Sequence, residues 1–302
     1  MADRVGFIGL GAMGFPMAAN LVAAGAEVIV SNRSSGPVDR LEREGARRAG
    51  SLTELVENSD VVITMLPDSA DVADVLRGPG GIFSALRSGQ LLIDMSTISP
   101  VVTRELASEA GAMGADFLDA PVSGGDVGAR EGTLAIMVGG AAAALERARP
   151  LFDVMGASIT HVGDVGAGQV VKAANQIVVA TTLAAIGEAL VLATHNGVTR
   201  EHTLSVLGGG GANSRMLELK RTKLATQSYE PTFRATLQSK DLGIALASAR
   251  ESGVPLPLTA IVDQLYRVVE SKGWGGLDHS VVVRAIELLA AERGTEESEE
   301  SP

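Results

Sequence analysis

The first half of the chain alternates short apolar, β-favouring runs with longer amphipathic segments. Runs bounded by turn residues predict strands at positions 5–9, 27–30, 60–66, 91–95, 115–119, 134–138 and 158–162. Positions 12–24 have helical spacing and stop at Gly25, a residue that ends helices without steric strain. This alternation predicts an α/β fold, in which helices cover a doubly wound parallel sheet.

The β signal disappears after position 165, and the rest of the chain is predicted to be helical. A nearly charge-free stretch at 169–194 predicts one long buried helix that joins the two parts, and Asn196-Gly197 ends it. Further helices are predicted at about 200–207, 213–224, 234–252, 257–271 and 279–291. We therefore expect an α/β domain at 1–165, an all-α domain at 166–292 and an acidic, disordered tail at 293–302.

The charge balance narrows the classes of partner. The 302 residues hold 25 Lys and Arg against 36 Asp and Glu, a formal net charge of −11, which argues against a nucleic-acid partner. The sequence has no cysteine, which excludes disulfides and cysteine nucleophiles and fits a cytoplasmic location. Its four histidines lack metal-ligand spacing, so no metal site is predicted. The longest uncharged run, 5–26, is interrupted by glycines and a proline, so neither a membrane span nor a secretory signal is predicted.

The segment Gly9-Leu10-Gly11-Ala12-Met13-Gly14 follows the first predicted strand and opens the first helix with the spacing G-x-G-x-x-G. Gly9 permits a tight turn, Gly11 lets the backbone approach a pyrophosphate, and Gly14 lets the helix pack closely on the strand. The amides at the helix start then face the phosphates. A bare glycine pattern fits an ordinary tight turn equally well, but this position between a strand and a helix favours a dinucleotide site.

The second predicted strand ends in Asn32-Arg33-Ser34, where a dinucleotide-binding domain contacts the adenosine ribose. No acid stands there to bind a free ribose, and Arg33 is suited to a 2′-phosphate, with Asn32 and Ser34 as polar contacts. NADP(H) is therefore favoured and NAD(H) stays possible; a solvated surface arginine is the alternative. Met65-Leu66-Pro67 and Ser96-Thr97 end two later strands at the edge where such sheets bind ligands, although each also fits an ordinary strand exit.

Two further segments carry candidate chemistry. Ser123-Gly124-Gly125 pairs a hydroxyl with a glycine turn, which suits a substrate carboxylate or, alternatively, a capped turn. Lys172 is the only charge between Asp164 and Glu188, and it shares a helix face with Asn175 and Gln176. A lysine partly removed from water is suited to protonate a carbonyl oxygen as hydride arrives; a lysine whose stem covers apolar surface is the alternative.

Taken together, these motifs resemble those of the β-hydroxyacid dehydrogenase family, in the family's order and over about residues 3–292. The resemblance rests on the segments at 6–14, 94–97, 119–125, 166–176 and 240–242. Within the family, the segments at 173–180, 187–190 and 255–260 look most like those of tartronate semialdehyde (2-hydroxy-3-oxopropionate) reductases. The 3-hydroxyisobutyrate dehydrogenases are the main alternative.

The resemblance implies a Rossmann domain joined by a long helix to a helical domain, with the active site between them, and a homodimer or homotetramer. It implies that Lys172 is catalytic, that Ser123, Gly124 and Gly125 hold the carboxylate of a small substrate, and that Asn175 helps to bind it. It places Thr97 and Lys240 against the cofactor, and Phe233 and Asp241 in the substrate pocket.

The expected reaction interconverts a small 3-oxo acid and its hydroxyacid with NADP(H), for which tartronate semialdehyde and D-glycerate are the favoured pair. A 3-hydroxyisobutyrate or L-serine dehydrogenase differs only in pocket residues, so the sequence leaves the substrate open. An imine reductase shares the architecture but usually has Asp or Tyr in place of Lys172. A non-catalytic dinucleotide-binding scaffold is disfavoured by the intact lysine.

Overall fold

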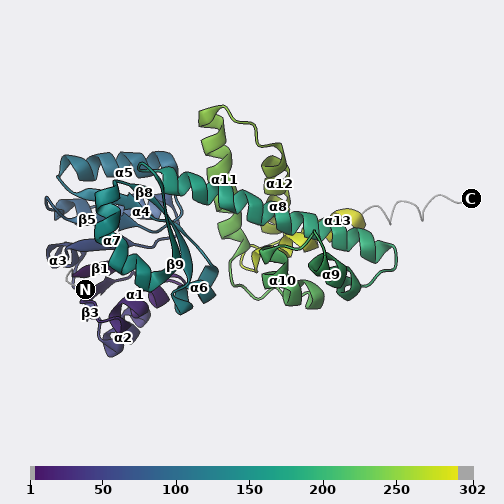
Figure 1. The fold of residues 1–302 in the computed structure, drawn as a ribbon, viewed down its shortest axis with the longest axis horizontal. Helices are drawn as coiled ribbons and strands as arrows, with labels where there is room; N and C mark the ends of the chain where they lie inside the picture. The colour runs from purple at the N-terminus through teal and green to yellow at the C-terminus, as the bar shows by residue number, and fades with distance from the viewer. Residues whose placement is uncertain (1–3, 292–302) are drawn as a thin grey trace, which may run out of the picture. The chain divides into compact units, whose positions relative to one another are not determined.

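The computed structural model describes residues 4–291, which divide into two units between Lys172 and Ala173. Figure 1 shows the elements of both units. The acidic tail predicted at 293–302 lies outside the described residues.

The strands of the first unit form a single sheet whose order begins β3-β2-β1-β4-β5-β6, all parallel. This order puts β1 beside β4, at the switch point where doubly wound sheets bind ligands. The predicted parallel α/β arrangement is confirmed for these strands. Their bounds, with those of three further strands, are β1 (Val5–Ile8), β2 (Val28–Ser31), β3 (Arg47–Arg48), β4 (Val61–Thr64), β5 (Leu91–Asp94), β6 (Asp116–Asp119), β7 (Val122–Ser123), β8 (Leu134–Gly140) and β9 (Gly156–Gly163).

The sheet departs from the predicted pattern at two places. β3 and β7 were not predicted, because two residues are too few to show an alternating pattern. β8 runs antiparallel to both β6 and β7, and only β9 pairs with it in parallel. The sheet therefore has a parallel part, which carries the motifs, and a mixed edge.

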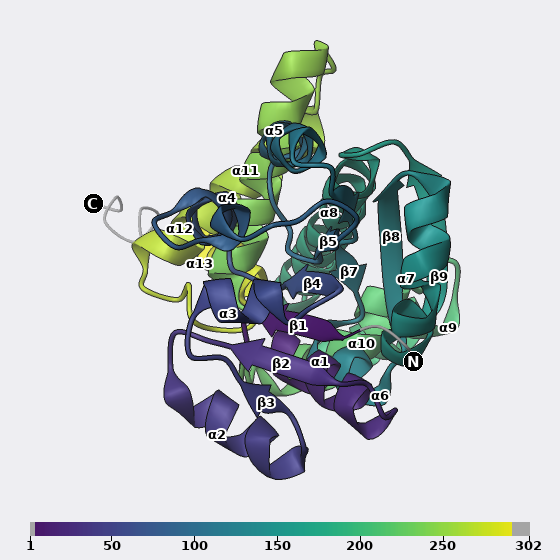
Figure 2. The same cartoon turned by 90° about the vertical axis from the view of Figure 1, so that its left-hand side faces the viewer.

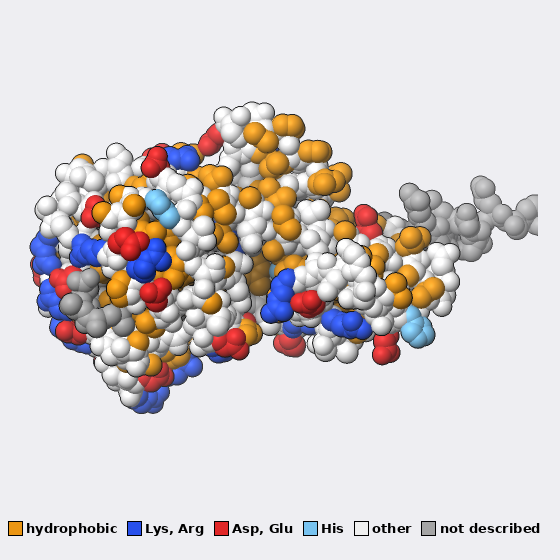
Figure 3. Space-filling model, in the orientation of Figure 1, with side chains coloured by type: hydrophobic (Ala, Val, Ile, Leu, Met, Phe, Trp, Pro, Cys, Tyr) orange, Lys and Arg blue, Asp and Glu red, His pale blue; other side chains and the backbone are white. Residues whose placement is uncertain are grey.

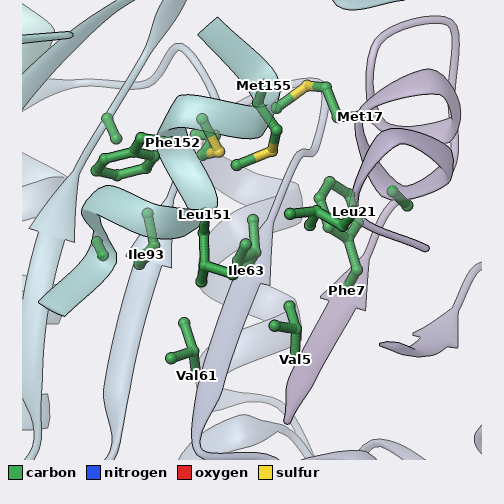
Figure 4. Close-up of a cluster of buried hydrophobic side chains, with 14 of the residues drawn as sticks. Val5, Phe7, Met17, Leu21, Val61, Ile63, Ile93, Leu151, Phe152 and Met155 are labelled. Carbon is green, nitrogen blue, oxygen red and sulfur yellow. The ribbon is translucent and has the colours of Figure 1, made fainter. Parts of the chain in front are cut away.

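Helices cover both faces of this sheet because alternate side chains of each strand point to opposite sides. Val5 and Phe7 of β1 belong to one apolar cluster and Ile8 to the other. Figure 4 shows side chains of α1 and α7 meeting those of the strands on the first face. Figure 2 shows α3, α4 and α5 on the opposite side. The helices are α1 (Gly14–Ala23), α2 (Ser35–Glu44), α3 (Leu52–Glu57), α4 (Ser69–Arg77), α5 (Pro100–Ala112), α6 (Gly125–Glu131), α7 (Ala142–Met155) and the 3₁₀ helix η1 (Ile82–Ser84).

The second unit is helical, as predicted, and begins within α8 (Ala167–His195). Its core includes Leu183 of α8 and the fully buried Tyr266 and Val282. α8 ends before Asn196, and Gly197 adopts a φ of +78°, as the predicted helix stop requires. The remaining elements are α9 (Arg200–Gly209), α10 (Arg215–Thr226), α11 (Ala235–Ser252), α12 (Pro257–Ser271), η2 (His279–Val281) and α13 (Val282–Ala291).

By length and composition alone, α8 is also apolar enough to cross a membrane. The core helix of a soluble protein meets the same test. Ala180, Leu183 and Leu190 of this helix are buried against its neighbours. Only 39% of its apolar window is buried, however, and Val178 and Leu192 are exposed, so the prediction of a buried helix is wrong for part of its surface.

Candidate active site

The turn after β1 has the geometry that its glycines predict. Gly9 adopts a φ of +96°, and a Cβ on it would lie 2.3 Å from the Met65 carbonyl oxygen. A Cβ on Gly14 would lie 1.9 Å from the Gly9 carbonyl oxygen, so α1 can start this close to β1 only with glycine there. A Cβ on Gly11 would meet nothing within 4 Å. The turn thus presents open backbone where a pyrophosphate is expected, and it fits a dinucleotide cofactor.

Asn32 holds this turn in place. Its side-chain oxygen accepts a hydrogen bond from the Leu10 amide at 2.9 Å, and its side-chain nitrogen donates to the backbone and hydroxyl oxygens of Ser34. Asn32 therefore ties the glycine turn to the loop after β2. Arg33 and Ser34 are exposed at that loop, where the sequence predicts the ribose end of the cofactor.

The parallel register brings the other predicted cofactor segments to the same sheet edge. Thr64, the last residue of β4, pairs with Asp94, the last residue of β5. The Leu66 amide donates to the Ser96 hydroxyl at 2.9 Å, which links the loops after the two strands. Met65 and Leu66 are half-buried, Pro67 is exposed and Thr97 is half-buried. Their contacts with a cofactor remain predictions.

A buried carboxyl group lies beneath these loops. Asp94 is fully buried, and its Oδ1 accepts hydrogen bonds from the Thr64 hydroxyl at 2.9 Å and the Ser96 amide at 3.1 Å. Among the described residues, its Oδ2 has no hydrogen-bond partner. Burial raises the pKa of Asp94 to about 6, although the bonds from Ser96 and Thr64 act in the opposite direction.

A second buried carboxylate, Asp119 at the end of β6, anchors the start of α8. Its Oδ1 accepts a hydrogen bond from the Gly166 amide at 2.7 Å, and its Oδ2 accepts one from the Gln169 amide at 2.9 Å. These bonds satisfy amides that a helix leaves without intrahelical partners in its first turn. Burial raises the pKa of Asp119, and the two backbone hydrogen bonds partly offset that rise.

Lys172 lies one turn beyond this anchor. The side-chain oxygen of Gln169 accepts from the Ile98 amide at 3.1 Å, and its nitrogen donates to the Ser96 carbonyl oxygen at 2.8 Å. Gln169 thereby joins α8 to both sides of Thr97. Because residues three apart share a helix face, Lys172 lies on the face that meets the loop after β5. Its side chain is only 6% exposed.

The Ser123-Gly124-Gly125 segment forms a turn that ordinary residues adopt only with strain. Ser123 ends β7, and the two glycines have φ values of +136° and +63° as the chain enters α6. A Cβ on Gly125 would meet nothing within 4 Å, so its backbone lies open. The turn is suited to an exposed anion, as the sequence predicts.

In the second unit, the predicted residues of α8 and α11 are joined by a chain of polar contacts. The Asn175 side chain donates to that of Gln176 at 2.9 Å, and Gln176 donates to Oδ2 of Asp241 at 2.6 Å. Lys240 Nζ lies 3.2 Å from Oδ1 of the same carboxylate. Asp241 is therefore a buried structural partner of α8, at 2% exposure; its role in a substrate pocket remains a prediction.

The segment that carries Phe233 is held by a buried ion pair. Oδ2 of Asp278 accepts hydrogen bonds from Lys220 Nζ and the Thr232 hydroxyl, both at 2.8 Å. Phe233 packs edge-on against His279, with ring centroids 5.2 Å apart. Burial acts to raise the pKa of Asp278, but the charges of His279 and Lys220 outweigh it and leave the pKa below its ordinary value.

Sequence reasoning missed several of these residues. Gln169 is a polar residue on an apolar helix, three positions before the candidate lysine. That spacing indicates that the two side chains share a helix face, so it could have identified Gln169. The partnership of Lys220 with Asp278 spans 58 residues and has no local signature. Within residues 4–291, no group of three or more His, Asp or Glu residues is placed to hold a metal ion.

Comparisons with known proteins show which family the chain belongs to. Residues 4–163 match the NAD-binding domain of 6-phosphogluconate dehydrogenase, and residues 166–286 match the NAD-binding family of NADP-dependent 3-hydroxyisobutyrate dehydrogenase. The chain is 44% identical to a 2-hydroxy-3-oxopropionate reductase of Escherichia coli (strain K12), over 95% of this chain and 98% of that protein. It is 38% identical to an NAD-dependent L-serine dehydrogenase of Pseudomonas aeruginosa, over 92% of this chain and 96% of that one.

A solved structure is also similar. The 3-hydroxyisobutyrate dehydrogenase of Mycobacterium tuberculosis, determined with L-serine, gives a TM-score of 0.87 at 36% identity. The match covers 95% of this chain and 99% of that one.

Proposed function

Because this chain belongs to the 3-hydroxyisobutyrate dehydrogenase-like β-hydroxyacid dehydrogenase family of NAD(P)-dependent enzymes, we propose that it interconverts tartronate semialdehyde and D-glycerate. A catalytic role for Lys172 is supported by its placement: it is a buried lysine on a helix turn anchored by Asp119 and Gln169. Support for the substrate comes from the relative that is 44% identical, whose name gives 2-hydroxy-3-oxopropionate, which is tartronate semialdehyde.

In this proposal, the residues of the chain bind the substrate and move a proton. The amides and hydroxyl of Ser123-Gly124-Gly125 hold the substrate carboxylate, which fixes the carbonyl group relative to the chain. Lys172 Nζ donates a proton to the carbonyl oxygen during reduction and accepts it back during oxidation. The chemistry that the nicotinamide cofactor supplies when bound is hydride transfer to or from the substrate carbon. Asn175, Phe233 and Asp241 are further proposed substrate residues.

The proposed cofactor is NADP(H). Support comes from Arg33, exposed at the loop after β2, and from a family description that specifies an NADP-dependent enzyme. The other proposed cofactor contacts outside the glycine turn are Met65-Leu66-Pro67, Thr97 and Lys240. The relative that acts on L-serine is NAD-dependent, so cofactor preference differs between relatives of this chain and has to be measured.

L-serine is the second candidate substrate. A similar protein is named as an L-serine dehydrogenase, and the similar solved structure was determined with L-serine. L-serine and D-glycerate both carry a hydroxymethyl group beside a carbon that bears a carboxylate, so a carboxylate anchor and a catalytic lysine suit both. The two substrates differ at the carbon beside the carboxylate, which bears an amino group in L-serine and a hydroxyl in D-glycerate. The pocket residues that contact this group determine which of the two is the substrate.

We also propose that the protein is a cytoplasmic homodimer or homotetramer. Several large apolar side chains remain exposed on its helices, including Val178 and Leu192 of α8 and Leu258 and Ile261 of α12, each more than 60% exposed. Figure 3 shows hydrophobic side chains at the surface around the end of α11 and the start of α12. Exposed apolar patches of this kind are typical of surfaces that bind another chain.

The test is a substrate panel combined with replacement of the lysine. Tartronate semialdehyde, D-glycerate, L-serine and 3-hydroxyisobutyrate are assayed with both nicotinamide cofactors. The exchange Lys172→Ala should lower kcat by about 10²- to 10⁴-fold, the usual contribution of a general acid, while cofactor binding persists. The exposed Lys272→Ala is the matched control. Undiminished turnover by the Lys172 variant, or no turnover of any hydroxyacid by the wild type, would refute the proposal.

A further inference from the structure

A small cavity lies where β2 ends, beside the edge strand β3. Its volume is about 150 Å³, or roughly five times the 30 Å³ that one water molecule occupies in the liquid. That volume accommodates a phosphate group but not a whole dinucleotide. Two arginines, Arg33 and Arg48, are among the eight residues that line it, and none of the eight is acidic. Its wall therefore offers two guanidinium groups as hydrogen-bond donors for an anion.

Arg48 reaches this cavity because of the strand pairing. β3 runs parallel to β2 with Arg48 opposite Val30, and the Ala49 amide donates to the Val30 carbonyl oxygen at 3.0 Å. Successive side chains of a strand point to opposite faces, so the adjacent Arg47 points away. The contacts agree: Arg47 pairs with Glu54 of α3, on the other side of the sheet.

Arg48 itself pairs with two carboxylates of α2, Asp39 and Glu42. Its side chain is 41% exposed, and ion pairs in contact with water contribute little net stability. The guanidinium group has five donors in a planar fork, enough to bind a phosphate while it keeps a carboxylate partner. The present ion pairs therefore orient Arg48 beside the cavity without preventing it from binding an anion.

We propose that Arg48 is a cofactor-specificity residue, which together with Arg33 binds the 2′-phosphate of NADP(H) in this cavity. The inference rests on the NADP(H) preference proposed above, since NAD(H) has no phosphate at that position. It adds a residue from β3, a strand without any sequence signature, to a site otherwise built from the loop after β2.

The test compares Arg48→Ala with Arg47→Ala, its neighbour on the same strand. Arg48→Ala should lower kcat/KM for NADPH by about 10-fold, the effect of losing one charge-assisted contact at a solvent-exposed site, and should leave kcat/KM for NADH unchanged. Arg47→Ala should change neither value. Arg48→Lys should restore part of the NADPH value, because a lysine keeps the charge but loses the fork. Equal losses with both cofactors, or no loss with NADPH, would overturn the proposal.

A binding experiment separates this proposal from the proposed function. Calorimetry measures the affinities of wild type and Arg48→Ala for 2′,5′-ADP and for 5′-AMP, which differ only in the 2′-phosphate. The variant should lose affinity for 2′,5′-ADP alone. This result stands even if the wild type acts on another substrate, which would defeat the proposed function and not the role of Arg48. An equal affinity of wild type and variant for 2′,5′-ADP would defeat that role.

Discussion

Replacing Asp119 by asparagine tests whether this carboxylate positions the catalytic helix. Its two oxygens accept hydrogen bonds from the amides of Gly166 and Gln169, which begin the turn before Lys172. Asparagine has the same shape but only one acceptor oxygen, so one of the two amides would face an NH₂ group. The site is too tight for the side chain to turn aside, since even a Cβ on Gly168 would lie 2.8 Å from Oδ2.

The cost can be worked out from these contacts. A hydrogen bond to a charged group contributes about 1.5–3 kcal/mol, and a buried amide without a partner costs a similar amount. Burial already raises the pKa of Asp119, which means that burying its charge costs free energy. The neutral asparagine avoids this cost, which offsets part of the destabilisation. The expected net destabilisation is about 2 kcal/mol. For a unit of this size, 2 kcal/mol corresponds to a fall in Tm of about 4–8 °C.

The effect on turnover should exceed the effect on stability. A shift of about 1 Å in a catalytic group can cost about 100-fold in rate, and the start of α8 sets the position of Lys172. We expect kcat to fall by about 10- to 100-fold, with little change in KM for the cofactor, because Asp119 does not touch the glycine turn. Calorimetry measures Tm, and steady-state kinetics at a temperature well below it measure kcat.

The matched control is Asp116→Asn, the same exchange at the exposed start of the same strand. It should leave Tm and kcat at their wild-type values. If Asp119→Asn also keeps both values, the carboxylate neither anchors α8 nor positions Lys172. A fall in Tm with unchanged kcat would show that the anchor serves stability alone.

Two further predictions concern buried charges. The pKa of Asp94, raised to about 6, means that the folded protein binds this proton more tightly than the unfolded chain, so ionisation lowers stability as pH rises from about 4 to 6. The shift is about 2 pKa units, which at about 1.4 kcal/mol per unit predicts that Asp94→Asn is more stable than wild type by about 3 kcal/mol at pH 7.5. This advantage should disappear near pH 4, as urea unfolding at the two pH values would show; a pH-independent difference would contradict the assignment. Lys220→Met should cost about 3–5 kcal/mol because it leaves Asp278 charged and buried, whereas Lys223→Met, one turn later on α10, should cost less than about 1 kcal/mol. Similar melting curves for these two lysine variants would show that the ion pair contributes no more than a surface contact.

Much of the architecture was predictable because its signals are local. The alternation of apolar runs and amphipathic segments predicted five strands of the parallel sheet, β1, β2, β4, β5 and β6, to within about two residues, but not the edge strand β3. Gly25 and Gly197 end α1 and α8 as expected. The glycine turn was predictable for the same reason, since the steric demands at Gly9 and Gly14 arise within a few residues of chain. Arg48 was not predictable, because a two-residue strand shows no period.

The sequence by itself determined which segments form strands and helices, where the glycine turn lies and that one lysine stands alone on an apolar helix. Each of these follows from spacing within about one turn or one strand. Only the tertiary structure decided that Asp119 holds the amides of residues 47 and 50 positions later, and that Lys220 pairs with Asp278 across 58 positions. Strand order and helix packing determine such partners, because the sequence around a side chain does not indicate which distant group will pair with it.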